Sequence, residues 1–173
     1  DPLQTVGAAA VAIAPAKGEL PARAVFSNSV GGTLKEQVPL QVFWGGERGL
    51  DAKNVWTIPF ASGYESSAAD LNRDGYVDLI ALNSGHAGAV SATDPTLGIN
   101  IFWGGKDGFE LKQGRTVLRE ENLGTSNVAD LNRDGFLDLV VGQFSRSKTA
   151  TETQLIIYYG GKNGFDSTPR AAI

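Results

Sequence analysis

One segment of this chain occurs twice, and the repetition constrains the fold more than any other feature of the sequence. Residues Ala69–Ile80 recur as Ala129–Val140, identical at all but three positions and offset by 60 residues. A recurrence with a period of this length is typical of chains that stack copies of one supersecondary unit. We therefore expect a repeat architecture.

A second motif keeps the same period. A pair of aromatic residues followed by two glycines occurs at Phe43–Gly46, Phe102–Gly105 and Tyr158–Gly161, with spacings of 59 and 56 residues. Two independent motifs that share one period make a chance similarity very unlikely. The sequence thus predicts three units of about 58–60 residues, with boundaries at 1–58, 59–118 and 119–173.

Within each unit the apolar residues come in short runs that are rich in β-branched and aromatic types. Runs of four to eight such residues, bounded by glycine and polar clusters, indicate strands rather than helices. The last unit contains four of them, at Ser126–Ala129, Leu137–Phe144, Leu155–Tyr159 and Thr168–Ile173. Four strands per repeat is the pattern of a β-propeller blade, so the fold class predicted is all-β.

Acidic and amide side chains alternate at the start of each repeated segment, in a pattern that suits a hard cation. Ca²⁺ takes six to eight oxygen ligands from carboxylates, amides and backbone carbonyls. Positions 1, 3 and 5 of a tight loop converge, glycine at position 6 allows the turn, and position 7 offers its carbonyl oxygen. The predicted ligands, with position 9 added, are Asp70, Asn72, Asp74, Tyr76 and Asp78 in one loop, and Asp130, Asn132, Asp134, Phe136 and Asp138 in the other.

Other interpretations of these loops fit their residues less well. A plain polar turn would explain one Asp/Asn/Gly cluster, but three like charges crowded together twice favour a counter-ion. An EF-hand requires glutamate at position 12, where this chain has Ala81 and Val141. Zinc and copper lack nitrogen or sulfur ligands nearby, whereas magnesium stays possible. The sequence predicts two Ca²⁺ ions.

The first unit has the strand-end motif but not the acidic ligands. Its corresponding stretch, 12–21, retains a glycine, Gly18, and has no aspartate. We expect a blade that keeps its shape and binds no metal.

The two aspartate loops, together with the Trp-Gly-Gly strand ends, resemble FG-GAP/VCBS-type propeller repeats, which also form the heads of integrin α-subunits. The resemblance implies blades of four antiparallel strands, calcium in the loop between the first two strands, and a secreted, periplasmic or cell-surface location. It implies no single activity, because such propellers serve as adhesion heads, as lectins and as accessory domains of polysaccharide-degrading enzymes.

Composition narrows the classes of partner. The net charge of −4 and the pI of about 5.0 argue against nucleic acid. No apolar run is long enough for a membrane helix. The absence of cysteine excludes disulfides, and a chain that starts at Asp1 and lacks methionine is expected to be a processed or excised piece.

Several other residues were considered as functional candidates. His86, the single histidine, is expected in an exposed loop, and Glu120–Glu121 on a solvated surface. Trp44, Trp103 and Tyr159 hold equivalent repeat positions and are expected to pack between blades, whereas Trp56 has no counterpart and is the better candidate for an exposed contact. The unequal polar loops Ser84–Leu97 and Ser145–Thr153 are candidate recognition loops.

The function that these features favour is a calcium-binding propeller segment that acts as a binding or interaction module, in adhesion or carbohydrate recognition. The alternative is the propeller portion of a polysaccharide lyase or glycoside hydrolase whose active site lies largely outside this chain. A purely structural spacer is a third interpretation. The partners expected are further blades in the parent chain or a second copy, and a glycan or an extracellular protein.

Overall fold

The computed structural model describes residues 8–28, 39–59, 63–84, 93–109, 115–144, 154–166 and 171–172. All regular structure in these ranges is β, and none of them contains a helix that could cross a membrane. The prediction of an all-β chain is confirmed.

Each repeat folds into one four-stranded antiparallel sheet, and the strands of a sheet follow one another in the chain. The first sheet contains β1 (Ala8–Ala14), β2 (Arg23–Asn28), β3 (Leu40–Gly46) and β4 (Gly49–Ile58). The second contains β5 (Gly63–Ala69), β6 (Asp78–Asn83), β7 (Gly98–Phe102) and β10 (Arg115–Leu118), with a small ribbon of β8 (Gly104–Gly105) and β9 (Gly108–Phe109). The third contains β11 (Leu123–Ala129), β12 (Asp138–Gln143), β13 (Leu155–Tyr158) and β14 (Ala171–Ala172).

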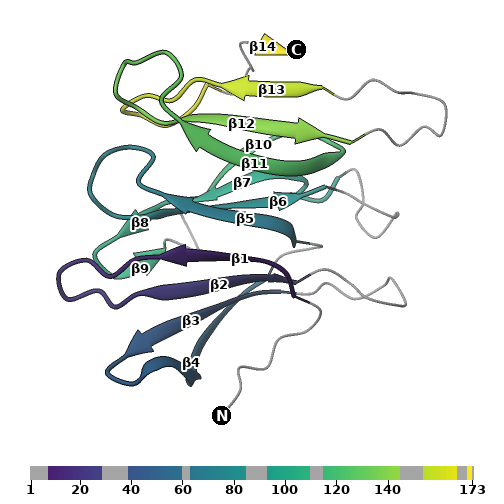
Figure 1. Ribbon diagram of the computed structural model, residues 1–173. Coiled ribbons are helices and arrows are strands. Elements are labelled where there is room, and N and C mark those ends of the chain that lie inside the picture. The colour runs from purple at the N-terminus through teal and green to yellow at the C-terminus, as the bar shows by residue number, and fades with distance from the viewer. Residues whose placement is uncertain are drawn as a thin grey trace.

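The three sheets stack in chain order like the blades of a propeller (Figure 1). Their first strands, β1, β5 and β11, lie side by side, and the later strands spread outward. We call the face of a sheet that points toward the next sheet in the chain its forward face.

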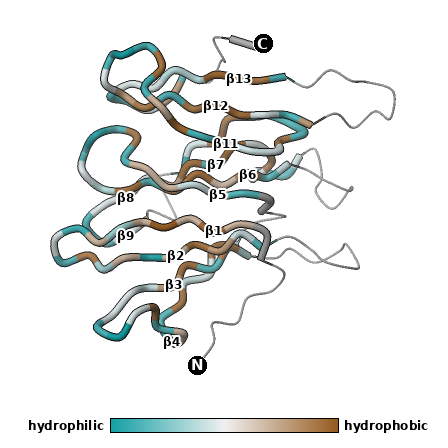
Figure 2. Tube along the Cα trace, in the orientation of Figure 1, coloured by the Kyte–Doolittle hydropathy of each residue, from teal (hydrophilic) through white to brown (hydrophobic). Residues whose placement is uncertain are grey.

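The central strands of the middle sheet, β6 and β7, are buried on both faces, which explains why they are almost continuously apolar. Successive side chains of a strand point to opposite faces. Leu79 and Ala81 of β6 therefore pack into the cluster shared with the first sheet, whereas Ile80 and Leu82 pack into the cluster shared with the third. Figure 2 shows the apolar segments within the stack and the hydrophilic ones in the loops at its edge.

The three sheets are equivalent in register. The pairing of the first two strands ends at Ala14 with Arg23, at Ala69 with Asp78 and at Ala129 with Asp138, and each pairing has one irregularity near its other end. The loops that follow β1, β5 and β11 consequently have the same length and lie along one edge of the molecule, at the left of Figure 1. The predicted metal ligands fall in the second and third of these loops.

Candidate metal-binding loops

The two aspartate loops share an unusual backbone path. Gly75 and Gly135, at position 6, have φ values of 88° and 93°. Arg73 and Arg133, at position 4, also lie in the left-handed region, with φ values of 61° and 60°. This region is sparsely populated by residues with a side chain. Sequence reasoning identified the glycine turn but missed the second left-handed position, because arginine gives no sign of it.

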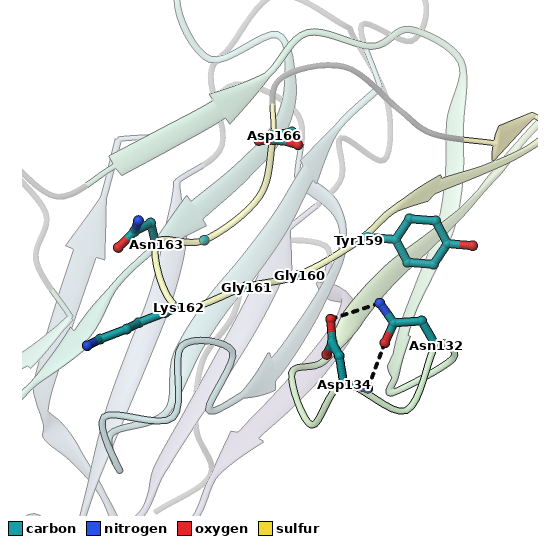
Figure 3. A pocket seen from close by; sticks show the side chains of 9 residues that line it. Asn132, Asp134, Tyr159, Gly160, Gly161, Lys162, Asn163 and Asp166 are labelled. Atoms are coloured by element: carbon teal, nitrogen blue, oxygen red, sulfur yellow. Dashed lines mark hydrogen bonds between the residues drawn. The ribbon is translucent and has the colours of Figure 1, made fainter.

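Positions 3 and 5 are held together by the same hydrogen bonds in both loops. The amide Nδ2 of Asn72 donates to Asp74 Oδ2 over 3.1 Å, and the backbone N–H of Asp74 donates to Asn72 Oδ1 over 3.0 Å. In the third sheet the corresponding distances between Asn132 and Asp134 are 2.8 and 2.9 Å, as Figure 3 shows. Two of the predicted ligands in each loop are therefore adjacent.

The carboxylate at position 5 also accepts a hydrogen bond from the backbone N–H at position 7. Asp74 Oδ1 lies 2.7 Å from the nitrogen of Tyr76, and Asp134 Oδ1 lies 2.8 Å from that of Phe136. The latter bond is the largest cause of a lowered pKa of Asp134, with a smaller contribution from Asn132. A lowered pKa keeps this exposed carboxyl group ionised.

Position 1 differs between the two loops. Both oxygens of Asp130 accept backbone hydrogen bonds, Oδ1 from Asp134 at 3.1 Å and Oδ2 from Gly135 at 2.9 Å. In the second sheet Asp70 Oδ1 is buried and has no hydrogen-bond partner. A buried carboxylate oxygen without a donor is costly, so this atom calls for a ligand.

Position 9 has a role that sequence reasoning did not foresee. Asp78 and Asp138 are fully buried. Asp78 accepts the N–H of Leu71 at 2.8 Å through Oδ2 and the N–H of Gly104 at 2.7 Å through Oδ1. Asp138 accepts those of Leu131 at 2.7 Å and Gly160 at 2.9 Å. Each carboxylate ties the loop to the glycine pair at the end of the third strand.

This tie explains why the two sequence motifs occur together. A Cβ atom at Gly104 would collide with the carbonyl of Val77, and one at Gly160 with that of Leu137. Glycine is needed there so that the strand end can approach the carboxylate. Burial raises the pKa of Asp78 to about 6, against the two backbone hydrogen bonds, with smaller contributions from the charges of Asp74 and Asp70.

Position 7 carries an aromatic ring whose contact also went unforeseen. The Nζ of Lys17, in the first sheet's loop, lies 5.1 Å from the ring centre of Tyr76, and the Cζ of Arg73 lies 5.5 Å from that of Phe136. Each ring thus receives a cation from the loop of the preceding sheet. The residues of each contact lie far apart in the chain, so the spacing within a loop gave no sign of the contact.

The first loop places cations where the other loops place ligands. By strand register its positions 3 and 9 are Lys17 and Arg23. The expectation that its glycine corresponds to the position-6 glycine was wrong. Gly18 falls at position 4, where its φ of 57° matches that of Arg73, and Leu20 stands at position 6.

Arg23 is the largest fully buried side chain of the described residues. Its guanidinium carbon lies 4.6 Å from the ring centre of Phe109 and 5.3 Å from that of Trp44, and desolvation lowers its pKa. With no carboxylate at this position, the N–H of Gly45 donates instead to the carbonyl of Ala22 at 2.6 Å. In the first sheet, a hydrogen bond between backbone groups thus connects the loop to the end of the third strand without a side chain.

The oxygen donors of the two aspartate loops fit a hard cation in part. Carboxylate, amide and carbonyl oxygens are the donors that Ca²⁺ takes. In the described part of the chain, no three acidic or histidine side chains already form a cluster suited to a metal. The fit therefore depends on positions 1, 3, 5 and 7 together, with position 9 engaged by backbone donors.

The tryptophans pack between sheets. Trp44 is buried against Gly108, and the ring of Trp103 occupies the same place against Gly164 while its Nε1 donates to Thr116 Oγ1. Trp56, expected to be an exposed contact, is half-buried, with its ring centre 4.6 Å from that of Trp44. Trp56 has no equivalent in the other repeats, but its ring is still packed, because strand pairing brings Trp56 of β4 opposite β3.

The remaining candidates divide between the described and undescribed parts of the chain. Glu120 accepts the hydroxyl of Tyr158 at 2.6 Å, and Glu121 is exposed. Burial, with this hydrogen bond second, raises the pKa of Tyr158. His86 and most of both candidate recognition loops lie outside the described residues.

Comparison with protein families gives a match over part of the chain. Residues 70–141, from the first ligand of one aspartate loop through the whole of the other, match the FG-GAP-like repeat. No curated protein matches the chain.

Proposed function

Because residues 70–141 of this chain match the FG-GAP-like repeat, we propose that the chain is a calcium-stabilised β-propeller segment that acts as an extracytoplasmic binding module. The repeat and the stacked sheets support the coarser statement, a propeller-like interaction module. The bound calcium, the extracytoplasmic location and the kind of ligand are what we propose.

The observation that carries the calcium proposal is the buried, unpartnered Oδ1 of Asp70, in a loop where the amide of Asn72 and the carboxylate of Asp74 are hydrogen-bonded to each other. Asp70, Asn72 and Asp74 would hold the ion in the second sheet, and Asp130, Asn132 and Asp134 in the third. When bound, the ion supplies positive charge that offsets these carboxylates and links their oxygens. The chain's own contribution is the left-handed turn that brings them together, anchored by Asp78 and Asp138.

A ligand surface for the module is available at the other end of the sheets. A polar hollow of about 390 Å³ lies between the second and third sheets, lined by Leu97, Arg119, Glu120, Glu121 and Gln143. Charged and amide groups next to a leucine suit a hydroxyl-rich ligand such as a glycan. The metal loops would stiffen the sheets that form this hollow without touching the ligand.

Calorimetric titration of the full chain with Ca²⁺ tests the proposal. We expect two ions per chain, and one ion for each of the variants Asp74→Ala and Asp134→Ala. The exposed Asp51→Ala serves as the control and should retain both ions. A stoichiometry of zero, or a third tight site, would refute the proposal.

A further inference from the structure

Among the described residues, the forward face of the third sheet carries exposed apolar side chains at positions that are buried on the forward face of the second sheet. Leu71 and Ile99 of the second sheet are 1% and 0% exposed, because the third sheet covers them. Their equivalents in the third sheet, Leu131 and Leu155, are 49% and 47% exposed. Apolar residues at the same register are thus buried in the second sheet, which has a neighbouring sheet on this side, and exposed in the third.

Two contacts recur at both junctions between sheets. At each, the ring after the third strand packs on a turn glycine of the next sheet: Trp44 on Gly108, and Trp103 on Gly164. At each, the loop cation reaches the glycine–aromatic pair of the next loop, from Lys17 to Gly75–Tyr76 and from Arg73 to Gly135–Phe136.

The third sheet presents the same two groups with nothing opposite them among the described residues. Arg133 is exposed and has the left-handed backbone of Arg73, and Tyr159 stands where Trp103 stands. Tyr159 borders a hollow of about 570 Å³, together with Asn132, Asp134 and the 160–164 turn (Figure 3). The hollow lies where the junction contacts would be made.

We propose that this forward face is a docking surface for a further blade of the metal-loop type. Its occupant would bring a glycine–aromatic pair to Arg133 and a turn glycine to Tyr159, and would bury Leu131 and Leu155. The first strand of that blade would carry small side chains, as Ser66 and Ser126 do on the faces that already dock.

The first sheet of a second copy fits this surface less well. Its loop has Leu20 and Pro21 in place of the glycine–aromatic pair, so Arg133 would meet no ring. Its first strand presents Val11 and Ile13, 54% and 58% exposed, where the docking faces of the other two sheets carry smaller side chains at the matching register. The contacts therefore favour a metal-loop blade over self-association.

The test extends the full chain by one blade. A second copy of residues 59–118 is joined after Ile173, and hydrogen exchange is measured on the amides of β13, in calcium and in chelator. We expect exchange of Leu155–Tyr158 to slow by about tenfold or more, since docking removes local opening. The matched control joins residues 1–58 instead and should protect these amides much less.

Variants of the extended chain locate the contact. Leu131→Asp or Arg133→Ala should reverse most of the protection, while circular dichroism verifies that the added blade has folded. Unchanged exchange, an added blade that stays unfolded, or equal protection by residues 1–58 would overturn the assignment. So would dimerisation of the unextended chain that Leu131→Asp abolishes, because the occupant would then be a second copy. If the β13 amides are protected in chelator and the chain binds no calcium, the docking inference holds although the proposed metal sites fail.

Discussion

Among single residues, the buried aspartate at position 9 of each aspartate loop connects two parts of the backbone. Asp78 is fully buried and accepts two backbone hydrogen bonds that bridge a loop and a strand end 26 residues further along the chain. Arg23 holds the same register position in the first sheet and is stabilised by two aromatic rings. The same register position thus holds a carboxylate bound by backbone N–H groups in two sheets and a guanidinium packed on aromatic rings in the first sheet.

Replacing Asp78 by alanine should destabilise the protein whether or not calcium is present. The change leaves the N–H groups of Leu71 and Gly104 without acceptors, at a cost of about 2–4 kcal/mol in the free energy of unfolding. Urea unfolding, in calcium and in chelator, measures the loss. The exposed Asp51→Ala should stay within about 0.5 kcal/mol of the parent. A loss that vanishes in chelator would identify Asp78 as a metal ligand instead.

At the level of elements, each aspartate loop has a polar side, where its own side chains are hydrogen-bonded, and a side that contacts neighbouring loops. In the two aspartate loops the side chains at positions 3 and 5 are hydrogen-bonded to each other, whereas Arg73 at position 4 and the rings at position 7 contact neighbouring loops. The left-handed residues at positions 4 and 6 separate these two sets by turning the chain between them.

Asp74→Ala should be costly only when calcium is available. The residue is exposed, and its hydrogen bonds lie within the loop, so its effect on stability is expected to act through metal binding. Binding linkage gives a few kcal/mol at saturating metal. Thermal unfolding with calcium should show a clear loss of Tm, and unfolding in chelator almost none. Equal losses in both conditions would mean that the loop is only a turn.

The cation–aromatic contact between loops should be measurable as a coupling energy. A double-mutant cycle of Arg73→Ala and Phe136→Leu is expected to give about 0.5–1 kcal/mol. The matched cycle pairs Arg133→Ala with Phe136→Leu, in which the arginine belongs to the same loop as the ring and not to the preceding one. Its coupling should be near zero. Similar values in the two cycles would show that the contact contributes no specific energy.

At the scale of the whole molecule, two apolar layers lie between three sheets, and the middle sheet contributes to both. The outer faces of the stack carry the exposed apolar side chains, with Ile13 at one end and Leu131 at the other. The net charge of −4 adds to the local charge of the loops.

Calcium affinity should fall as salt is added, because two bound ions would bring the formal charge of the chain from −4 to zero. Screening acts over about 10 Å at 0.1 M salt, which covers the exposed loop carboxylates. Titrations between about 0.05 and 0.5 M NaCl should show a several-fold rise in Kd. A Kd that does not depend on salt would argue against binding in these exposed loops.

The repeat period, the strand content and the type of loop follow from the amino-acid sequence alone. The duplicated segment of Ala69–Ile80 and the recurring aromatic–glycine pairs carry this information locally, and the strands predicted in the last unit match β11, β12 and β13 to within a few residues. The metal itself is our proposal.

The groups that meet across the sheets could not be predicted from the sequence. The bond from Gly104 to Asp78, the ring of Phe109 over Arg23 and the packing of Trp56 on Trp44 join residues on different strands or sheets. Strand register also moved Gly18 from position 6 to position 4, since pairing of Ala14 with Arg23 fixes the loop length. Local spacing sets what each strand and loop can be, whereas contacts over such separations depend on how the sheets pair and stack.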